Sequence, residues 1–140
     1  MGAPEILLTD TGPLVSLIDP RERAHEACKK HVTSDPGPIV TTWPCVTEAM
    51  FVLRRDSGWP GQSALWGLVR SDGVIIMDLD AKIVSRCHEL MVKYVDVPMA
   101  LADATLVALA ERLRQRTVFT LDGHFSIYRL NDRQSIDVVP

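Results

Sequence analysis

Four acidic residues stand within or directly beside apolar stretches, where charge is costly: Asp10, Glu48, Asp103 and Asp122. Asp10 and Asp122 follow short apolar runs typical of buried strands, and the other two lie inside amphipathic helical patterns. Four carboxylates crowded together cannot all stay ionised unaided. A divalent cation prefers oxygen ligands and relieves that repulsion. If the fold brings them together, the four acids predict a site for metal-assisted cleavage of a phosphodiester bond.

Each of these acids also has a purely structural interpretation. Asp10 could cap the helix that follows it, and Asp122 could cap a short turn. Glu48 lies near the start of a helix, where a negative charge favours the helix dipole. Asp103 is the hardest to explain this way, because its neighbours one turn away are apolar and include no Lys or Arg. A buried carboxylate without a partner raises its pKa or binds a cation.

The chain alternates short apolar segments with longer amphipathic ones. Strands are expected at residues 5–9, 39–42, 74–77, 117–120 and 136–139. Helices are expected from about 13 to 19, over 21–34, from 43, over about 61–71, after an Asp80 cap, and over 99–114. This alternation predicts a three-layer α/β domain with a mainly parallel sheet. The carboxyl ends of such strands form one edge where ligands bind, which places Asp10 and Asp122 together.

Length and composition restrict the class of protein. The 140 residues suit a single domain over 1–140, and the net charge of −3 does not suit binding driven mainly by phosphate neutralisation. Three cysteines without a C-x-x-C pair predict buried free thiols in a reducing compartment: Cys28, Cys45 and Cys87. No basic signal-peptide region or membrane span is expected, so we predict a cytoplasmic protein without membrane association.

Other residues with chemical potential have simpler interpretations. The histidines show no zinc-ligand spacing with the cysteines and are predicted at the surface, with His124 near the rim of the acidic pocket. The three tryptophans are predicted to be core or subunit contacts: Trp43, Trp59 and Trp66. No phosphate-binding glycine motif occurs in the sequence.

Four segments together resemble one known family. They are Leu8-Thr9-Asp10-Thr11-Gly12-Pro13-Leu14, Thr47-Glu48, Leu101-Ala102-Asp103-Ala104 and Thr120-Leu121-Asp122-Gly123-His124-Phe125. In this order they resemble the PIN-domain ribonucleases, and most closely the VapC-type toxins of bacterial toxin–antitoxin pairs. The resemblance covers essentially the whole chain. Its most specific stretch is Asp96-Val97-Pro98 followed by the third segment.

The resemblance implies a PIN-like α/β/α domain whose five-stranded parallel sheet has the order 3-2-1-4-5. It implies an endoribonuclease that hydrolyses RNA with Mg²⁺ or Mn²⁺, forms a homodimer and pairs with a small antitoxin protein. Asp10 and Asp103 would be the main metal ligands. Glu48 and Asp122 would complete the site directly or through water.

Smaller features also carry over from the family. Hydroxyl groups would hydrogen-bond around the site from Thr9, Thr11 and Thr120. Gly123 departs from the pattern, since family members often carry a polar or basic residue there. Two alternatives remain open: a PIN-fold module that binds RNA or protein without cutting, and another acidic-site phosphohydrolase. The haloacid-dehalogenase type would need a D-x-D motif after the first strand, and Asp10-Thr11-Gly12 lacks the second acid.

Overall fold

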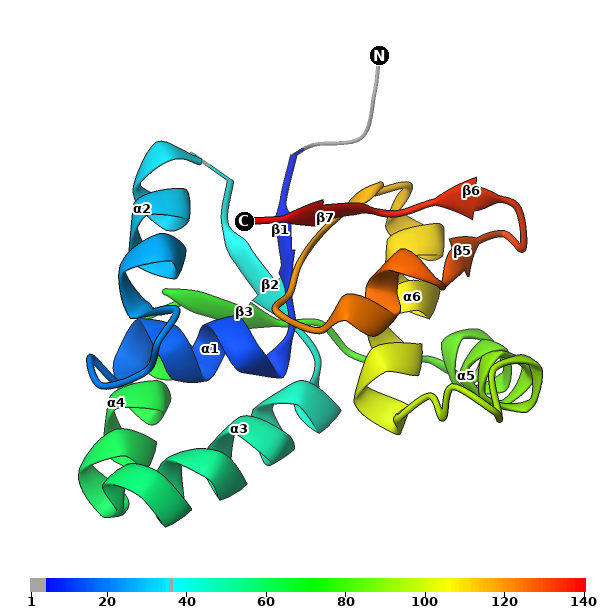
Figure 1. Cartoon of the computed structure of the whole chain (residues 1–140). Coiled ribbons are helices and arrows are strands. Elements are labelled where there is room, and N and C mark those ends of the chain that lie inside the picture. Colours follow the sequence, from blue (N-terminus) through cyan, green and yellow to red (C-terminus); the bar gives the residue numbers. More distant parts are fainter. Residues whose placement is uncertain (1–4, 36) are drawn as a thin grey trace.

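A computed structural model describes residues 5–35 and 37–140 of the chain (Figure 1). Its central sheet has five parallel strands in the order β3-β2-β1-β4-β7. These strands are β1 (Leu7–Thr9), β2 (Ile39–Thr41), β3 (Val74–Ile76), β4 (Thr117–Phe119) and β7 (Asp137–Val139). Because β7 is the fifth strand of this sheet, the expected order 3-2-1-4-5 is confirmed.

One small sheet was not expected. Strands β5 (Arg129–Leu130) and β6 (Gln134–Ser135) form an antiparallel pair between β4 and β7. Leu130 is the only apolar residue from Arg129 to Ser135, so this segment shows no alternating apolar pattern that would predict strands. The main strands are also shorter than predicted. Just beyond the strand ends, the N–H of Met77 still donates to the carbonyl of Thr41, and the N–H of Thr120 donates to the carbonyl of Val139. Sheet-like hydrogen bonding therefore extends one residue past β3 and β4.

The helices follow the predicted alternation with shifted ends. They are α1 (Thr11–Ile18), α2 (His25–Ser34), α3 (Trp43–Ser57), α4 (Trp59–Arg70), α5 (Ala81–Lys93), α6 (Leu101–Leu113) and the short 3₁₀ helix η1 (Gly123–Ser126). Helix α1 begins two residues before Pro13, which lies in the first turn and needs no backbone donor there. Helix α4 begins directly after Gly58, whose positive φ of 71° makes the sharp corner from α3.

Alternate residues of the central strands pack on opposite faces of the sheet. Leu8 and Val118 belong to a large core formed with α3, α5 and α6, whereas Leu7 and Phe119 pack with Cys28 of α2. Figure 1 shows α2 on one side of the strands and α5 and α6 on the other, and Leu65 of α4 belongs to the larger core. Helices therefore cover both faces, as expected for the three-layer architecture.

Helix α6 is the central helix of the larger core. Every residue from Ala102 to Ala110 is buried, and the repeated alanines allow close approach to the sheet and to α5. Helix α5 begins at Asp80, whose side chain accepts from the N–H of Ile83 at 2.9 Å, as predicted. Position 103 is thereby carried into the protein interior by the packing of its helix.

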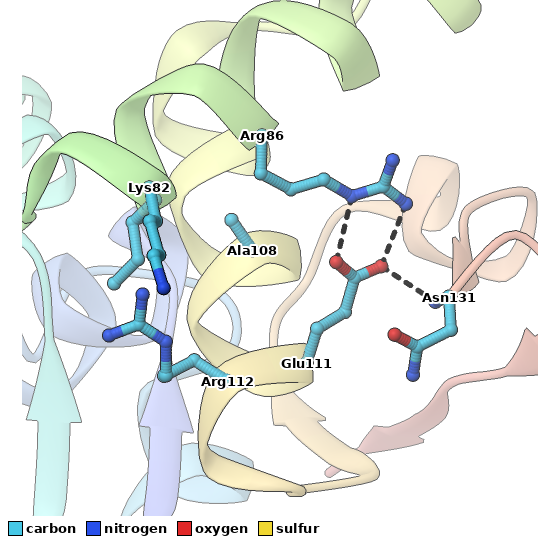
Figure 2. A pocket seen from close by; sticks show the side chains of 7 residues that line it. Lys82, Arg86, Ala108, Glu111, Arg112 and Asn131 are labelled. Carbon is cyan, nitrogen blue, oxygen red and sulfur yellow. Dashed lines mark hydrogen bonds and ion pairs between the residues drawn. The ribbon is translucent and has the colours of Figure 1, made fainter.

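An ion-pair cluster fastens α5 to α6 (Figure 2). The guanidinium of Arg86 donates to both carboxylate oxygens of Glu111, at 2.8 and 3.0 Å. Glu111 also accepts from the backbone N–H of Asn131 at 2.6 Å, which attaches the β5–β6 pair. Arg86 and Lys93 each contact Asp132 at 3.0 Å. These contacts hold three segments of the fold in place.

Several residue placements differ from the sequence predictions. Trp43, Trp59 and Trp66 are 45%, 64% and 41% exposed, so their assignment to the core is wrong, while a subunit contact stays a prediction. His25 and His31 are half-buried rather than at the surface, and His25 Nδ1 lies 2.7 Å from the carbonyl oxygen of Ser16.

The cysteine prediction is confirmed, since all three cysteines are buried free thiols. Within residues 5–35 and 37–140, the helices are too short or too polar for any of them to cross a bilayer.

Candidate active site

The four predicted acids lie around one depression of about 460 Å³ at the carboxyl edge of the sheet. Asp10 directly follows β1, Asp122 follows β4, Glu48 comes from α3, and Asp103 comes from α6. The walls are completed by Thr11, Gly12, Pro98, Ala100, Leu121 and His124. Among the described residues, no Lys or Arg lines this depression. The structure therefore brings together all four acids, and the only basic side chain in the described lining is that of His124.

Asp10 is only 6% exposed, and its backbone N–H donates to the carbonyl of Phe119 at 2.9 Å. It occupies the N-cap position of α1, but its side chain makes no capping bond, so the capping interpretation is wrong. Its Oδ2 accepts from the hydroxyl of Thr120 at 2.8 Å. Burial raises the pKa of Asp10, while the N–H of Thr11 and the Thr120 hydroxyl act in the opposite direction.

Asp103 lies in the first turn of α6 and is also 6% exposed. Its Oδ2 accepts from the buried hydroxyl of Tyr128 at 2.7 Å. Burial raises the pKa of Asp103 to about 6, and the negative charges of Asp10, Asp122 and Glu48 add to this rise, while the Tyr128 hydroxyl opposes it. In the part of the chain that the structure describes, no Lys or Arg lines the depression beside the Asp103 carboxylate.

Glu48 lies on the exposed side of α3, so the expectation of apolar surroundings is wrong for this residue. Its neighbour one turn later, Phe51, is 68% exposed and does not face the core. The hydroxyl of Thr11 lies 3.2 Å from Glu48 Oε2 and 3.2 Å from the carbonyl oxygen of Cys45. Glu48 therefore forms part of the open rim.

Asp122 combines a structural and a site position. Its Oδ1 accepts from the N–H of His124 at 2.9 Å and caps η1, so the capping interpretation applies here. The ring Nδ1 of His124 lies 3.3 Å from the same oxygen. His124 thus lies at the rim of the acidic pocket, where its sequence position suggested.

The three threonines have different contacts. Thr11 reaches Glu48 and Thr120 reaches Asp10, as described above. The hydroxyl of Thr9 donates instead to the carbonyl of Leu7 within its own strand, at 2.8 Å. Sequence reasoning missed Tyr128. Only its place shortly after the Thr120–Phe125 segment hints that it returns to the site.

The donor atoms suit a hard divalent cation. One ligand atom each from Asp103, Asp122 and His124 lie within 4.8 Å of one another. Asp10 and Glu48 line the same depression and add oxygen donors. Burial is the main cause of the raised pKa of Asp10 and Asp103, and a bound cation would offset this cost of holding their negative charge. The residues therefore fit a metal ion held mainly by oxygen.

Comparison with known proteins identifies the class of protein to which this fold and site belong. The PIN domain family model matches residues 7–130, so this chain belongs to the PIN domain family. The chain is 27% identical over 135 residues to Ribonuclease VapC26 of Mycobacterium tuberculosis, a match covering 96% of this chain and 100% of that protein.

Solved structures share the fold. The Mycobacterium tuberculosis toxin VapC20, described as cleaving the sarcin–ricin loop, superposes with a TM-score of 0.80 at 21% identity, over 86% of this chain and 93% of that one. VapBC2 from Rickettsia felis, solved bound to a promoter DNA fragment, superposes with a TM-score of 0.67 at 15% identity, over 97% of this chain and 100% of that one. A toxin–antitoxin complex from Klebsiella pneumoniae superposes with a TM-score of 0.59 at 19% identity, over 83% of this chain and 86% of that one.

Proposed function

We propose that this protein is an endoribonuclease toxin of a toxin–antitoxin pair, built as one PIN domain over residues 1–140. The observation that carries the proposal is the convergence of four carboxylates, from four separate segments, in a depression lined by no described Lys or Arg. Two of these acids are buried, which lowers the free energy of unfolding. A module that only binds a partner would have no need for such buried charge. The resemblance to Ribonuclease VapC26 supports RNA as the substrate.

Mg²⁺ or Mn²⁺ is the proposed cofactor. Asp10 and Asp103 would be its main ligands, and Glu48 and Asp122 would hold it directly or through water. When bound, such an ion polarises a phosphoryl oxygen and lowers the pKa of a water molecule. Zn²⁺ is disfavoured, because carboxylates dominate the donor set and no cysteine lines the depression in the described chain.

The protein's own groups prepare this site. Thr120 holds one oxygen of Asp10, and the hydroxyl of Thr11 lies within hydrogen-bonding distance of Glu48. These contacts restrict the rotation of two carboxylates before any ion arrives, which lowers the entropy lost on binding. The uncompensated negative charge also repels a phosphate backbone while the site is free of metal. A bound ion would offset this charge and favour the approach of RNA.

The proposed partner is a small antitoxin protein, as in the toxin–antitoxin complexes among the structural relatives. Helix α3 carries Glu48 between Trp43 and Phe51, which are 45% and 68% exposed. Trp66 of α4 lies beside Trp43, with ring centroids 6.5 Å apart. Glu48, on the same helix as Trp43 and Phe51, lines the acidic depression. An amphipathic helix would cover these exposed rings, and an Arg or Lys beyond the helix would enter the depression and pair with a carboxylate.

The resemblance also supports two coarser proposals: a homodimer and a cytoplasmic location. Light scattering of the purified protein tests the first, because a homodimer would have twice the mass of the 15.6 kDa chain. Fractionation of expressing cells tests the second.

The central test is cleavage of single-stranded and structured RNA by purified protein. We expect internal cuts with Mn²⁺, none with excess EDTA, and none with Asp10→Asn. Asp72→Asn is the matched control, since Asp72 is exposed in the turn before β3, at the opposite edge of the sheet, and Asn also tolerates its positive φ of 61°. RNA binding without cleavage would instead support the non-cutting module, and cleavage of small phosphate esters alone would support another phosphohydrolase.

The toxin role has a separate test in a bacterial host. Wild-type protein should arrest growth, Asp10→Asn should not, and coexpression of the neighbouring small gene should restore growth. Equal growth with wild type and Asp10→Asn would overturn the toxin role and leave a housekeeping nuclease.

A further inference from the structure

Tyr128 is a buried polar side chain whose only described hydroxyl partner is a carboxylate of the proposed site. The residue has no exposed surface, and its hydroxyl lies 2.7 Å from Asp103 Oδ2. Its ring packs edge-on against Tyr94 and Phe125, with centroid distances of 5.0 and 5.1 Å. These two rings leave the Tyr128 side chain little rotational freedom, so its hydroxyl points at one fixed place.

We propose that Tyr128 is a positioning residue for the metal site, which holds one oxygen of Asp103 so that the other faces the ion. The inference rests on the proposed function, because it concerns how that site binds its cation. A neutral phenol can donate only one hydrogen bond, and Asp103 Oδ2 takes it. The carboxylate plane is then fixed by a donor on one side, with Oδ1 directed to the remaining ligands.

The same arrangement occurs at the other buried acid. Thr120 donates to Oδ2 of Asp10 at 2.8 Å, and the Cys45 thiol lies 3.8 Å from Oδ1. Thr120 and Tyr128 stand at the two ends of one segment that also carries Asp122. This segment therefore supplies one acid of the site and a hydroxyl donor to each of the two buried acids. A ligand carboxylate held by a neighbouring donor is a common requirement of metal sites.

A purely structural role makes a different prediction. A buried tyrosine needs an acceptor, and Asp103 would then serve Tyr128 rather than the reverse. In that case, replacing the tyrosine by phenylalanine would alter stability but leave the affinity for metal unchanged. If Tyr128 acts as a positioning residue, the affinity for metal falls even where the fold is intact.

The test compares Tyr128→Phe with Tyr94→Phe. Both variants remove one hydroxyl from the same aromatic cluster, but the Tyr94 hydroxyl accepts from the backbone N–H of Arg129 and touches no carboxylate of the site. Mn²⁺ binding to the metal-free protein is measured by electron paramagnetic resonance and calorimetry. We expect the dissociation constant to rise about 10- to 100-fold in Tyr128→Phe and to stay within about twofold in Tyr94→Phe.

A second pair of variants keeps the test decisive if Tyr128→Phe loses stability. In Asp103→Asn protein, adding Tyr128→Phe should cause no further loss of Mn²⁺ affinity, because the acid through which Tyr128 acts is gone. Equal Mn²⁺ affinity in wild type and Tyr128→Phe would overturn the inference, and so would the same loss in both backgrounds. Absence of Mn²⁺ binding by the wild type would instead overturn the proposed metal site itself.

Discussion

Two groups of acidic side chains in this protein differ in whether basic residues neutralise their charge. In the ion-pair cluster around α5, Arg86 contacts Glu111 (Figure 2), and it also contacts Glu89 and Asp132, so each acid has a basic partner. The hydrogen bonds from Lys93 and Arg86 lower the pKa of Asp132. In the acidic depression, burial raises the pKa of Asp103 to about 6, and no described Lys or Arg compensates it. Paired charge holds the fold together, whereas unpaired charge marks the site.

Helix α6 carries one residue of each group. Glu111 lies in its last turn, where the helix dipole disfavours an acid, yet two hydrogen bonds from Arg86 more than offset this. Asp103 lies in the first turn, where the dipole favours it, yet its pKa is still raised. These two acids of comparable burial therefore differ in their partners: Arg86 pairs with Glu111, and no described Lys or Arg lines the depression around Asp103. The difference is the presence of a cation, which is what a bound metal would restore.

The largest effect should come from removing the charge of Asp103 at the start of α6, with Glu111 near its end as the control. Asp103→Asn should lower RNA cleavage at saturating Mn²⁺ by about 1,000-fold or more, because it removes a proposed metal ligand. Glu111→Gln should leave the rate per folded molecule within about twofold, since that residue lies in the ion-pair cluster. Turnover assays, normalised to the folded fraction from circular dichroism, measure both. Wild-type turnover in Asp103→Asn would rule out Asp103 as a ligand.

The next effect concerns stability rather than activity. Arg86→Gln leaves Glu111, whose side chain is 10% exposed, without its cation, and should lower the free energy of unfolding by about 2–4 kcal/mol. Arg55→Gln is the control, because Arg55 pairs with Asp56 on the open surface and should cost under about 1 kcal/mol. Urea unfolding gives both values. Equal losses in the two variants would mean that the α5–α6 cluster contributes no more than a surface pair.

Metal addition should stabilise the protein through the acidic depression and not through the ion-pair cluster. At a hundredfold excess over its dissociation constant, Mn²⁺ should stabilise the wild type by roughly 2.7 kcal/mol, since it binds the folded site and hardly the unfolded chain. Arg86→Gln should gain the same increment, and Asp10→Asn much less. Thermal-shift titration measures the gain. A wild type that does not respond to millimolar Mn²⁺ would contradict the proposed site.

The smallest effect is the dependence of stability on pH in the absence of metal. The folded-state pKa of Asp103 is raised from 3.8 to about 6, so its contribution to stability is fully present below pH 3.8 and is lost as the pH rises through 6. Between pH 5 and pH 7.5 this loss should be about 1 kcal/mol. It should disappear in Asp103→Asn, and urea unfolding at both pH values tests it. The pKa of Asp132 is lowered, so its contribution to stability has the opposite pH dependence and is lost on acidification.

Sequence alone predicted a large part of this arrangement, for identifiable reasons. Apolar runs ending at Asp10 and near Asp122 indicate parallel strands whose ends share one edge, and the structure places both acids there. The strand order came from the family resemblance, because periodicity does not specify which strands are neighbours. The exposure of Glu48 was not predictable, since the apolar Phe51 one turn away suggested a buried face.

Tyr128 shows why the remaining part of the site could not be predicted. Its hydroxyl reaches Asp103 only because η1 and the ring of Phe125 set its direction. No period of two or 3.6 residues describes a short 3₁₀ helix and the turn that follows it. Side chains in such segments are placed by tertiary packing, and a single sequence contains little information about that.

The hydrogen bond between Thr120 and Asp10 has a consequence for the order of folding events. It joins residues 110 positions apart in the chain, and β1 must pair with β4 before it forms. Helix pairs such as α3–α4 and α5–α6 are local and can form earlier, whereas closing so long a loop is slow. A partly folded molecule that contains only those helix pairs holds its acids far apart. We therefore expect the proposed metal site to form late in folding, after β1 has paired with β4, and incompletely folded copies to lack it.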